Sequence, residues 1–200
     1  MKGDKPGYPF FAMLSRMKYI NRWGLMRNTR SENIQEHSLQ VAMIAHALAL
    51  IKNKRFGGNA DADRAAAIAI FHDSDEILTG DLPTPVKYFN ESILNAYREV
   101  EDVAKDRLLS MLPESLRPDY KDLLYHDGES DAELWKLVKA ADTICAYIKC
   151  LEELSGGNAE FATAAKSTRQ KLDALELPEA RVFIDEFIGA FSLSLDDYGI

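Results

Sequence analysis

The stretch NIQEHSLQVAMIAHALALIKN, residues 33–53, decides the fold that this chain can adopt. Its apolar residues recur every three or four positions, which is the spacing of one helix face. Asn33, followed three residues later by Glu36, is typical of a capped helix start. Residues 38–51 carry no charge, so the segment suits a buried core helix but is too short to span a bilayer. We predict a helix over residues 34–53, ended by Gly57 and Gly58.

Outward from this segment, the same periodicity predicts one helix after another, and no segment alternates strictly enough to be a strand. Residues 79–85 are predicted to be a loop, because Pro83 and Pro85 lack N–H donors. The other predicted helices cover residues 9–21, 63–77, 92–112, 117–125, 131–154 (opened by a capping box of Ser130 and Glu133), 159–175 and 179–193. The sequence thus predicts a single all-α domain over residues 1–200. Its core spans about residues 30–155, with the C-terminal helices 159–195 packed on it.

Charge is unevenly distributed along the 200 residues, whose net charge is −8. Residues 5–31 hold six basic side chains and no acid, so the remainder of the chain is strongly acidic. An acidic body argues against binding a nucleic acid polymer, which depends on many phosphate contacts. The basic segment is compatible with one small anion or, alternatively, with a solvated helix face.

The two cysteines indicate the compartment. Cys145 and Cys150 lie five positions apart on a predicted helix and therefore diverge around its axis by about 140°, which prevents a disulfide between them. We expect reduced, structural thiols in a cytoplasmic protein, with no secretory signal and no membrane partner.

The histidines differ in how well they are placed for chemistry. His37 begins the 34–53 helix, in line with Val41 and Leu48, whereas His46 lies on the opposite side of that helix. The two cannot share a small ligand. We predict that His46 is a hydrogen-bonded core histidine, and that His126, which precedes Asp127 in a polar turn, belongs to a loop.

Carboxylates in apolar surroundings mark a second candidate region. His72-Asp73 ends the apolar run 65–71, and Glu76 follows within one helical turn. A charged carboxylate beside such a run is costly unless it is paired or binds a cation, although a solvated helix end is an equal alternative. Asp142 is an unusual mid-helix residue that could instead pair with Lys139 or Lys149 at the surface.

Four of these residues together form a candidate metal site. His37, His72, Asp73 and Asp142 offer two nitrogens and two oxygens from three predicted helices. That donor set suits a borderline divalent ion such as manganese, iron, cobalt or nickel, with positions left for water and substrate. Because no cysteine contributes, a structural zinc cage is not indicated.

Several motifs together resemble a known family. They are Asn21-Arg22-Trp23, Leu25-Met26-Arg27-Asn28, residues 36–42 (EHSLQVA), His72-Asp73, residues 79–89 (TGDLPTPVKYF) and residues 150–154 (CLEEL). Over about residues 10–195 the chain resembles the HD-domain phosphohydrolases and, among them, the bacterial 5′-deoxynucleotidases of the YfbR type. The His-Asp doublet is a weak motif, whereas Arg-Trp combined with Gly-Asp-Leu-Pro-Thr-Pro is far more specific.

This resemblance implies an HD-domain helical bundle that forms a homodimer. It would release phosphate from deoxyribonucleoside 5′-monophosphates and select against ribonucleotides, using one divalent transition metal per chain such as cobalt or manganese. The resemblance assigns the metal to His37, His72, Asp73 and Asp142, acid/base catalysis to Glu76, phosphate orientation to Arg22, sugar contact to Trp23, and nucleoside binding to Asp81, Leu82, Pro83 and Thr84, with Asp81 near the 3′-hydroxyl. His37, Asp73 and Asp142 would also contact the substrate.

Two other functions remain open at this stage. The chain could be another HD phosphohydrolase, acting on nucleoside triphosphates or cyclic nucleotides, although two-metal members need further histidines. It could also be a non-catalytic, metal-dependent nucleotide-binding module, against which Glu76 argues because binding alone needs no proton transfer. Without the resemblance, a solvated helix end is the preferred interpretation of Arg22, and a core anchor that of Trp23.

Overall fold

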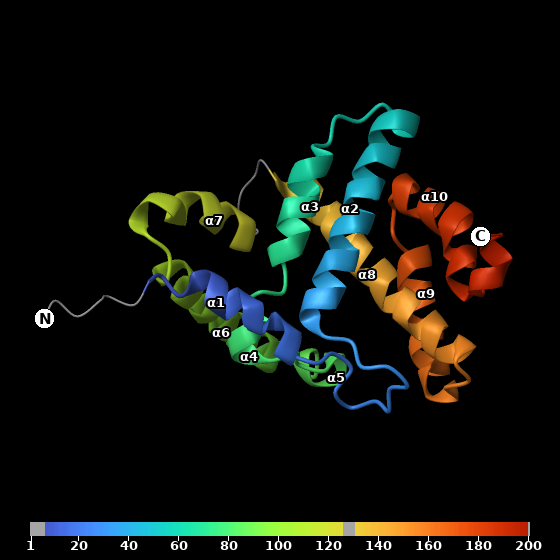
Figure 1. The fold of residues 1–200 in the computed structure, drawn as a ribbon, viewed down its shortest axis with the longest axis horizontal. Coiled ribbons are helices and arrows are strands. Elements are labelled where there is room, and N and C mark those ends of the chain that lie inside the picture. Colours follow the sequence, from blue (N-terminus) through green and yellow to red (C-terminus); the bar gives the residue numbers. More distant parts are fainter. Residues whose placement is uncertain (1–6, 126–130, 200) are drawn as a thin grey trace, which may run out of the picture.

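The computed structural model describes residues 7–125 and 131–199, and Figure 1 shows an assembly of helices around α2. Apart from one isolated antiparallel bridge between Asn21 and Asn33, these residues form no β structure. The α-helices are α1 (Phe10–Leu14), α2 (Ile34–Phe56), α3 (Ala62–Phe71), α4 (Glu76–Thr79), α5 (Thr84–Lys87), α6 (Glu91–Ser110), α7 (Arg117–Leu124), α8 (Ala132–Ser155), α9 (Ala162–Asp173) and α10 (Pro178–Phe187). The all-α prediction is confirmed. Within the described ranges, no helix is long and apolar enough to cross a membrane.

Hydrogen bonds to one capping residue and the conformation of one glycine determine where helix α2 begins and ends. The side chain of Asn33 accepts hydrogen bonds from the backbone N–H groups of Gln35 and Glu36, both at 3.0 Å. These bonds satisfy two of the donors that every helix start leaves unpaired. Gly57 ends the helix in the left-handed conformation, at φ 69°, which costs glycine little. The predicted helix is confirmed, with its end three residues later than expected.

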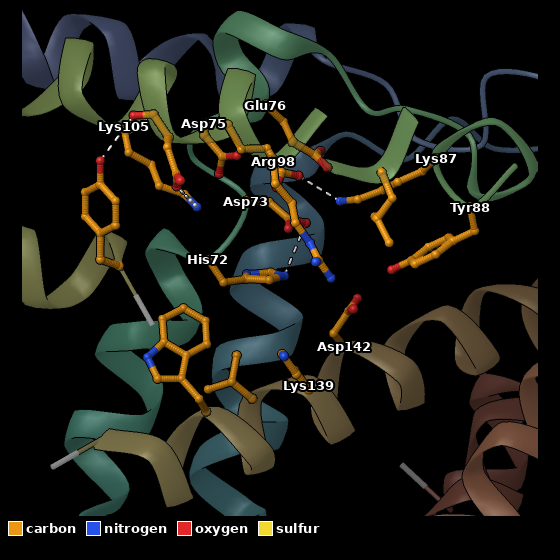
Figure 2. A pocket seen from close by; sticks show the side chains of 16 residues that line it. His72, Asp73, Asp75, Glu76, Lys87, Tyr88, Arg98, Lys105, Lys139 and Asp142 are labelled. Carbon is orange, nitrogen blue, oxygen red and sulfur yellow. Dashed lines mark hydrogen bonds and ion pairs between the residues drawn. The ribbon is translucent and has the colours of Figure 1, made fainter. Parts of the chain in front are cut away.

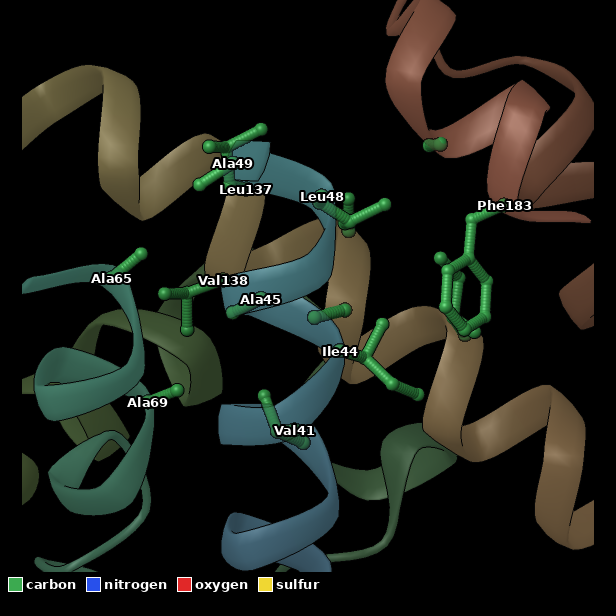
Figure 3. Close-up of a cluster of buried hydrophobic side chains, with 14 of the residues drawn as sticks. Val41, Ile44, Ala45, Leu48, Ala49, Ala65, Ala69, Leu137, Val138 and Phe183 are labelled. Atoms are coloured by element: carbon green, nitrogen blue, oxygen red, sulfur yellow. The ribbon is translucent and has the colours of Figure 1, made fainter. Parts of the chain in front are cut away.

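The core is built from one face of α2 against α3, α8 and α10 (Figure 3). Val41, Ile44 and Leu48 are buried along α2, as the helical spacing predicts. Alanines on the facing helices, including Ala65 and Ala69 of α3, let the backbones approach closely. His37 lies at one end of this buried face, so core packing fixes the direction in which its side chain points.

The predicted helix over residues 63–77 is wrong, because α3 ends at Phe71 and α4 starts at Glu76. Between them the backbone turns tightly: Ser74 N–H donates to Phe71 O, and Glu76 N–H to Asp73 O, both at 3.1 Å. This turn changes which side chains can meet. Adjacent residues diverge by about 100° in an α-helix, whereas the turn lets His72 and Asp73 face one place.

The prediction that residues 79–85 are all loop is also partly wrong. Thr79 still belongs to α4, and a helical turn, α5, starts at Thr84 with Pro85 in its first turn. Proline is tolerated there because the N–H groups of a first helical turn have no partner within the helix. The residues 9–21 form α1 followed by a 3₁₀ turn, Ser15–Tyr19, rather than one α-helix.

The prediction that His46 is a core histidine is wrong. Its side chain is 40% exposed, and its Nε2 lies 3.5 Å from Asp63 Oδ1. Its neighbours Leu39 and Met43 are 59% and 60% exposed. The reason is that the core face of α2 is the Val41 side, and no described part of this chain covers the opposite face. His126, Asp127 and the Ser130 half of the predicted capping box lie outside the described residues.

A buried carboxylate ties the segment after Arg22 and Trp23 to α8. Glu153 is 1% exposed and accepts hydrogen bonds from Thr29 N, Thr29 Oγ1 and Lys149 Nζ. Burial alone would raise the pKa of Glu153, but the hydrogen bonds from Lys149, Thr29 and Asn158 lower it overall. The charged form is therefore the one that the fold stabilises.

We expect Glu153→Gln to lower the free energy of unfolding by about 3–5 kcal/mol, the usual cost of removing one partner from a buried ion pair. Because the pKa of Glu153 is lowered on folding, its contribution is present above the ordinary pKa of glutamate, about 4.3, and is lost as the pH falls. The variant should therefore lose less stability between about pH 5 and pH 2 than the unmodified protein. Urea unfolding across pH measures both effects, and the exposed neighbour Glu152→Gln, which should change little, is the control.

Candidate metal and nucleotide site

Three side chains meet closely enough to hold one cation. Donor atoms of His37, His72 and Asp73 all lie within 4.8 Å of one another. Asp73 Oδ2 is 3.2 Å from His72 Nε2 and 3.6 Å from His37 Nε2. His37 comes from the first turn of α2, while the other two come from the turn after α3. The tight turn described above therefore creates this group.

The two imidazoles are prepared to act as ligands. His72 Nδ1 lies 2.7 Å from Ala69 O and so donates its N–H there, which directs Nε2 toward the cluster. The Nε2 atoms of His37 and His72 are buried, and no hydrogen bond of good geometry satisfies either one within the described ranges. Since a buried polar atom is normally satisfied, this donor set fits a divalent cation.

The charges of the cluster reinforce one another. Burial by itself would lower the pKa of His72. The neighbouring Asp73 outweighs this effect, and the pKa is raised to about 9. Burial likewise opposes ionisation of Asp73, yet the nearby His72, His37 and Arg22 lower the pKa of that carboxyl. Asp73 is therefore a carboxylate, surrounded by groups that favour negative charge.

Asp142 lies at the rim of the cluster. Its Oδ1 is 3.0 Å from His37 Nε2, although Asp142 is outside the compact group of three. Its side chain, on α8, is 42% exposed. Burial raises its pKa, but His37 and Arg22 outweigh that effect and lower it overall. The structure thus brings all four predicted ligands together, three of them tightly.

Arg22 is directed into this cluster and is not a solvated helix end. Its Nη1 donates to Asp73 Oδ2 at 3.2 Å, and its Nη2 lies 3.9 Å from Asp142 Oδ1. The backbone holds it there, because Arg22 N–H donates to Glu32 O at 2.9 Å, next to the bridge between Asn21 and Asn33. Burial would lower the pKa of Arg22, but the surrounding carboxylates raise it overall.

Trp23 follows Arg22 in a conformation that few residues adopt. Its φ of 60° makes it the only non-glycine residue with positive φ in the described chain. Its backbone N–H donates to Asp81 Oδ2 at 3.2 Å, and its ring packs on Phe161 with ring centroids 5.4 Å apart. Trp23 is thus partly a core anchor, and it also brings the 81–84 segment beside Arg22.

The sequence prediction missed Glu32. Its Oε2 accepts from both Arg22 Nε, at 3.2 Å, and Trp23 Nε1, at 3.1 Å, and its side chain is 13% exposed. One carboxylate oxygen therefore orients both side chains. The available signal was that Glu32 is the first acid after the acid-free residues 5–31.

Glu76, the first residue of α4, has a buried oxygen, Oε2, that no described residue hydrogen-bonds. Burial raises the pKa of Glu76 to about 10, and the neighbouring charges of Asp73 and Asp81 add to this effect. A carboxyl group in such surroundings has a proton to transfer near neutral pH.

Two cavities meet at the cluster, and Asp142 and Tyr88 line both of them. The first, shown in Figure 2, has a volume of about 590 Å³ and is lined by His72, Asp73 and Glu76 among others. The second, of about 720 Å³, is lined by Arg22, Trp23, Asp81, Pro83 and Thr84 among others. Leu82 lines neither cavity. Both volumes are within the usual range for small-molecule sites.

An all-helical fold that brings histidine and aspartate side chains together in one cluster is typical of HD-domain proteins. An HD-domain phosphohydrolase from Listeria innocua has the same fold, with a TM-score of 0.79 at 22% identity over 95% of this chain and 91% of that one. The HD phosphohydrolase DatZ of cyanophage S-2L, solved with dA and one catalytic Zn²⁺ ion, has a TM-score of 0.57 at 18% identity, covering 89% of this chain and 95% of that one.

The family follows from sequence similarity. The model of the YfbR-like 5′-deoxynucleotidases matches residues 9–191. Over 188 residues the chain is 55% identical to the 5′-deoxynucleotidase of Erwinia tasmaniensis, with 94% of each chain covered. It is 54% identical to 5′-deoxynucleotidase YfbR of Escherichia coli over the same share of each chain. The chain belongs to the YfbR-like 5′-deoxynucleotidase family, as the motifs predicted.

Proposed function

We propose that this protein hydrolyses deoxyribonucleoside 5′-monophosphates to deoxyribonucleosides and phosphate. The observation that carries the proposal is the position of Arg22, whose guanidinium contacts the metal-ligand candidate Asp73 and lines the second cavity. A nucleoside in that cavity would place its 5′-phosphate beside both. The 5′-deoxynucleotidase relatives support this assignment.

The four predicted ligand residues would hold the metal. His37, His72 and Asp73, completed by Asp142, fit one divalent transition ion such as cobalt or manganese. When bound, such an ion supplies a Lewis acid that polarises the phosphoryl group and favours deprotonation of water at neutral pH. His37, Asp73 and Asp142 would also face the phosphate.

The side chains around the donors divide the remaining tasks. Arg22 offers a planar guanidinium that binds and orients phosphate oxygens. Glu76, whose Oε2 is buried, transfers a proton between water and the 5′-oxygen of the leaving nucleoside. Asp81, with Pro83 and Thr84, forms the wall of the second cavity where the sugar lies, and Asp81 accepts from the 3′-hydroxyl. Leu82 lies between Asp81 and Pro83 in the chain but lines neither cavity.

Phosphate release from dAMP, with dATP and cyclic AMP as comparison substrates, tests the function. We expect phosphate release from dAMP but not from dATP or cyclic AMP. Preference for dATP or cyclic AMP would favour another HD phosphohydrolase activity. Metal-dependent binding of dAMP without release would favour a non-catalytic nucleotide-binding module.

Trp23 is expected to exclude ribonucleotides. Its indole N–H is already donated to Glu32, so it has no donor left for a 2′-hydroxyl, which would be buried without a full set of hydrogen bonds. That penalty is about 1–3 kcal/mol, or about 5–150-fold between dAMP and AMP.

In Trp23→Ala we expect the ratio of kcat/KM for dAMP to that for AMP to fall toward one. Trp23→Phe keeps a flat ring in the same place and is the control, because it should retain most of the preference. Equal hydrolysis of AMP and dAMP by the unmodified protein would contradict the role of Trp23.

Glu32 is expected to act through Arg22 and Trp23 as a positioning residue. A hydrogen bond to a charged group contributes about 1.5–3 kcal/mol, so we expect Glu32→Ala to lower kcat/KM for dAMP about 10–150-fold. Glu32→Gln, which retains an acceptor oxygen, should recover part of this loss and of the dAMP preference.

Glu160→Ala is the matched control for Glu32, because it removes the ion pair with Arg27 from the same segment. Arg27 is 91% exposed, and exposed pairs contribute little. Loss of activity in Glu160→Ala equal to that in Glu32→Ala would mean that any disturbance of the segment suffices.

The protein acts as a cytoplasmic homodimer in this proposal. The exposed apolar face of α2, formed by Leu39, Met43 and Leu50, offers a surface that a second copy would cover. Cys145 and Cys150 are both free and buried, which agrees with a reducing compartment. Light scattering in solution measures the oligomeric state.

A further inference from the structure

Two cationic side chains that line the first cavity have no assigned role in the proposed hydrolysis. We propose that Arg98 and Lys139 form a phosphate-binding subsite in this cavity, which receives inorganic phosphate after the ester bond is broken. The inference rests on the proposed function, since it assigns an exit to one product of that reaction.

The two cations come from different helices and face the same space. Arg98 belongs to α6, and Lys139 to α8, one turn before Asp142. Both line the first cavity together with His72 and Asp73. In Figure 2 their side chains extend from opposite walls toward the region beside Asp73 and Asp142. A small anion at this point would be reached from two sides.

The other two lysines of the cavity already have carboxylate partners. Lys87 Nζ donates to Glu101 Oε1 at 2.8 Å, and Lys105 Nζ lies 3.7 Å from Asp102 Oδ1. In contrast, neither Arg98 nor Lys139 has a side-chain hydrogen bond or ion pair with any residue in the described ranges. Both charges are therefore available to an external anion.

The charge of the centre explains why additional cations are needed. Arg22 is shared among Glu32, Asp73 and Asp142, so its charge is already offset by those carboxylates. A phosphate dianion released there would be repelled by Asp142 and Asp73 once it moved away from its ligands. Arg98 and Lys139 supply positive charge in the first cavity, which Asp73 and Asp142 also line.

The arrangement of the two cavities indicates the route by which phosphate would leave. Arg22, Trp23 and Asp81 line the second cavity, which the proposed function assigns to the nucleoside. Because the cavities meet at Asp142 and Tyr88, phosphate can leave through the first cavity while the nucleoside still occupies the second. The substrate phosphoryl group would instead be held by Arg22 and the metal-ligand residues.

The test measures binding of inorganic phosphate to the cobalt-loaded protein by calorimetry, in the absence of nucleotide. We expect the dissociation constant to rise about tenfold in the double variant Arg98→Gln/Lys139→Gln, equivalent to about 1.4 kcal/mol, and less in each single variant. The inhibition constant of phosphate against dAMP hydrolysis should rise equally, while KM for dAMP changes less than about twofold. Lys136→Gln is the matched control, because Lys136 is an exposed lysine on α8, like Lys139, but does not line the cavity.

The possible outcomes separate the alternatives. Unchanged phosphate binding in the double variant would overturn the subsite. A parallel rise in KM for dAMP would also overturn it, because the cations would then hold the substrate phosphoryl group. If the protein failed to hydrolyse dAMP but the double variant still lost phosphate affinity, the subsite would stand and the proposed function would fall.

Discussion

Replacing Glu76 with glutamine is expected to lower kcat for dAMP by about 10²–10⁴, the usual contribution of a positioned acid or base. The amide has nearly the shape of the carboxyl group but cannot transfer the proton. Glu76 lies outside the group of three donors that meet within 4.8 Å, so metal content and KM should change little. Steady-state kinetics and metal analysis of the same preparation measure these quantities.

Glu99→Gln is the matched control, because Glu99 is an exposed glutamate on α6 that lines neither cavity. We expect wild-type turnover from it. If Glu76→Gln lost its metal to the same extent as a variant of Asp73, Glu76 would be a ligand, and its assignment as a proton-transfer group would be wrong.

The second large effect concerns the metal itself. We expect Asp73→Ala to lower metal affinity by more than about 100-fold, since even an outer partner of a ligand costs about 10–100-fold. Asp73 is the carboxylate nearest both imidazoles and also binds Arg22. Hydrolysis of dAMP should fall to the level that a chelator produces with the unmodified protein. Competition with a metal-binding dye measures the affinity.

His46→Gln and Asp142→Ala complete this experiment. His46 is half-exposed and faces away from the cluster, so its variant should retain both metal and activity. Asp142→Ala should also lose metal or activity while remaining folded, because its oxygen lies 3.0 Å from His37 Nε2. Full metal occupancy with unchanged activity in Asp142→Ala would remove it from the ligand set. Thermal unfolding confirms that each variant is folded.

The extent of the agreement between sequence and structure follows from how local each feature is. Helix α2 was predictable because its start depends on Asn33 and its neighbours, and its buried face on the spacing of Val41, Ile44 and Leu48. Periodicity misplaces His46, because it shows which residues share a face but not which of two apolar faces is covered. That depends on α3, α8 and α10.

The break between α3 and α4 could not be predicted from helix propensity, because residues 63–77 suit a continuous helix. Tertiary contacts prevail there: His72, Asp73 and Ser74 are all held at the junction, with Asp73 bound to Arg22 from a distant segment. The pairing of Glu32 with Arg22 and Trp23 is equally non-local, since it needs the chain to fold back at the bridge of Asn21 and Asn33.

The sequence by itself determined the helical class of this protein, the register of His37 on α2, and the motifs that identify its family. These properties depend on spacing along the chain and on residue identity, which short segments already contain. Only the tertiary structure decided that His37, His72 and Asp73 meet within 4.8 Å, that Glu32 orients Arg22 and Trp23, and that two cavities join at Asp142. The reason is that a site is set by distances between side chains from separate helices, and packing of the whole chain fixes those distances.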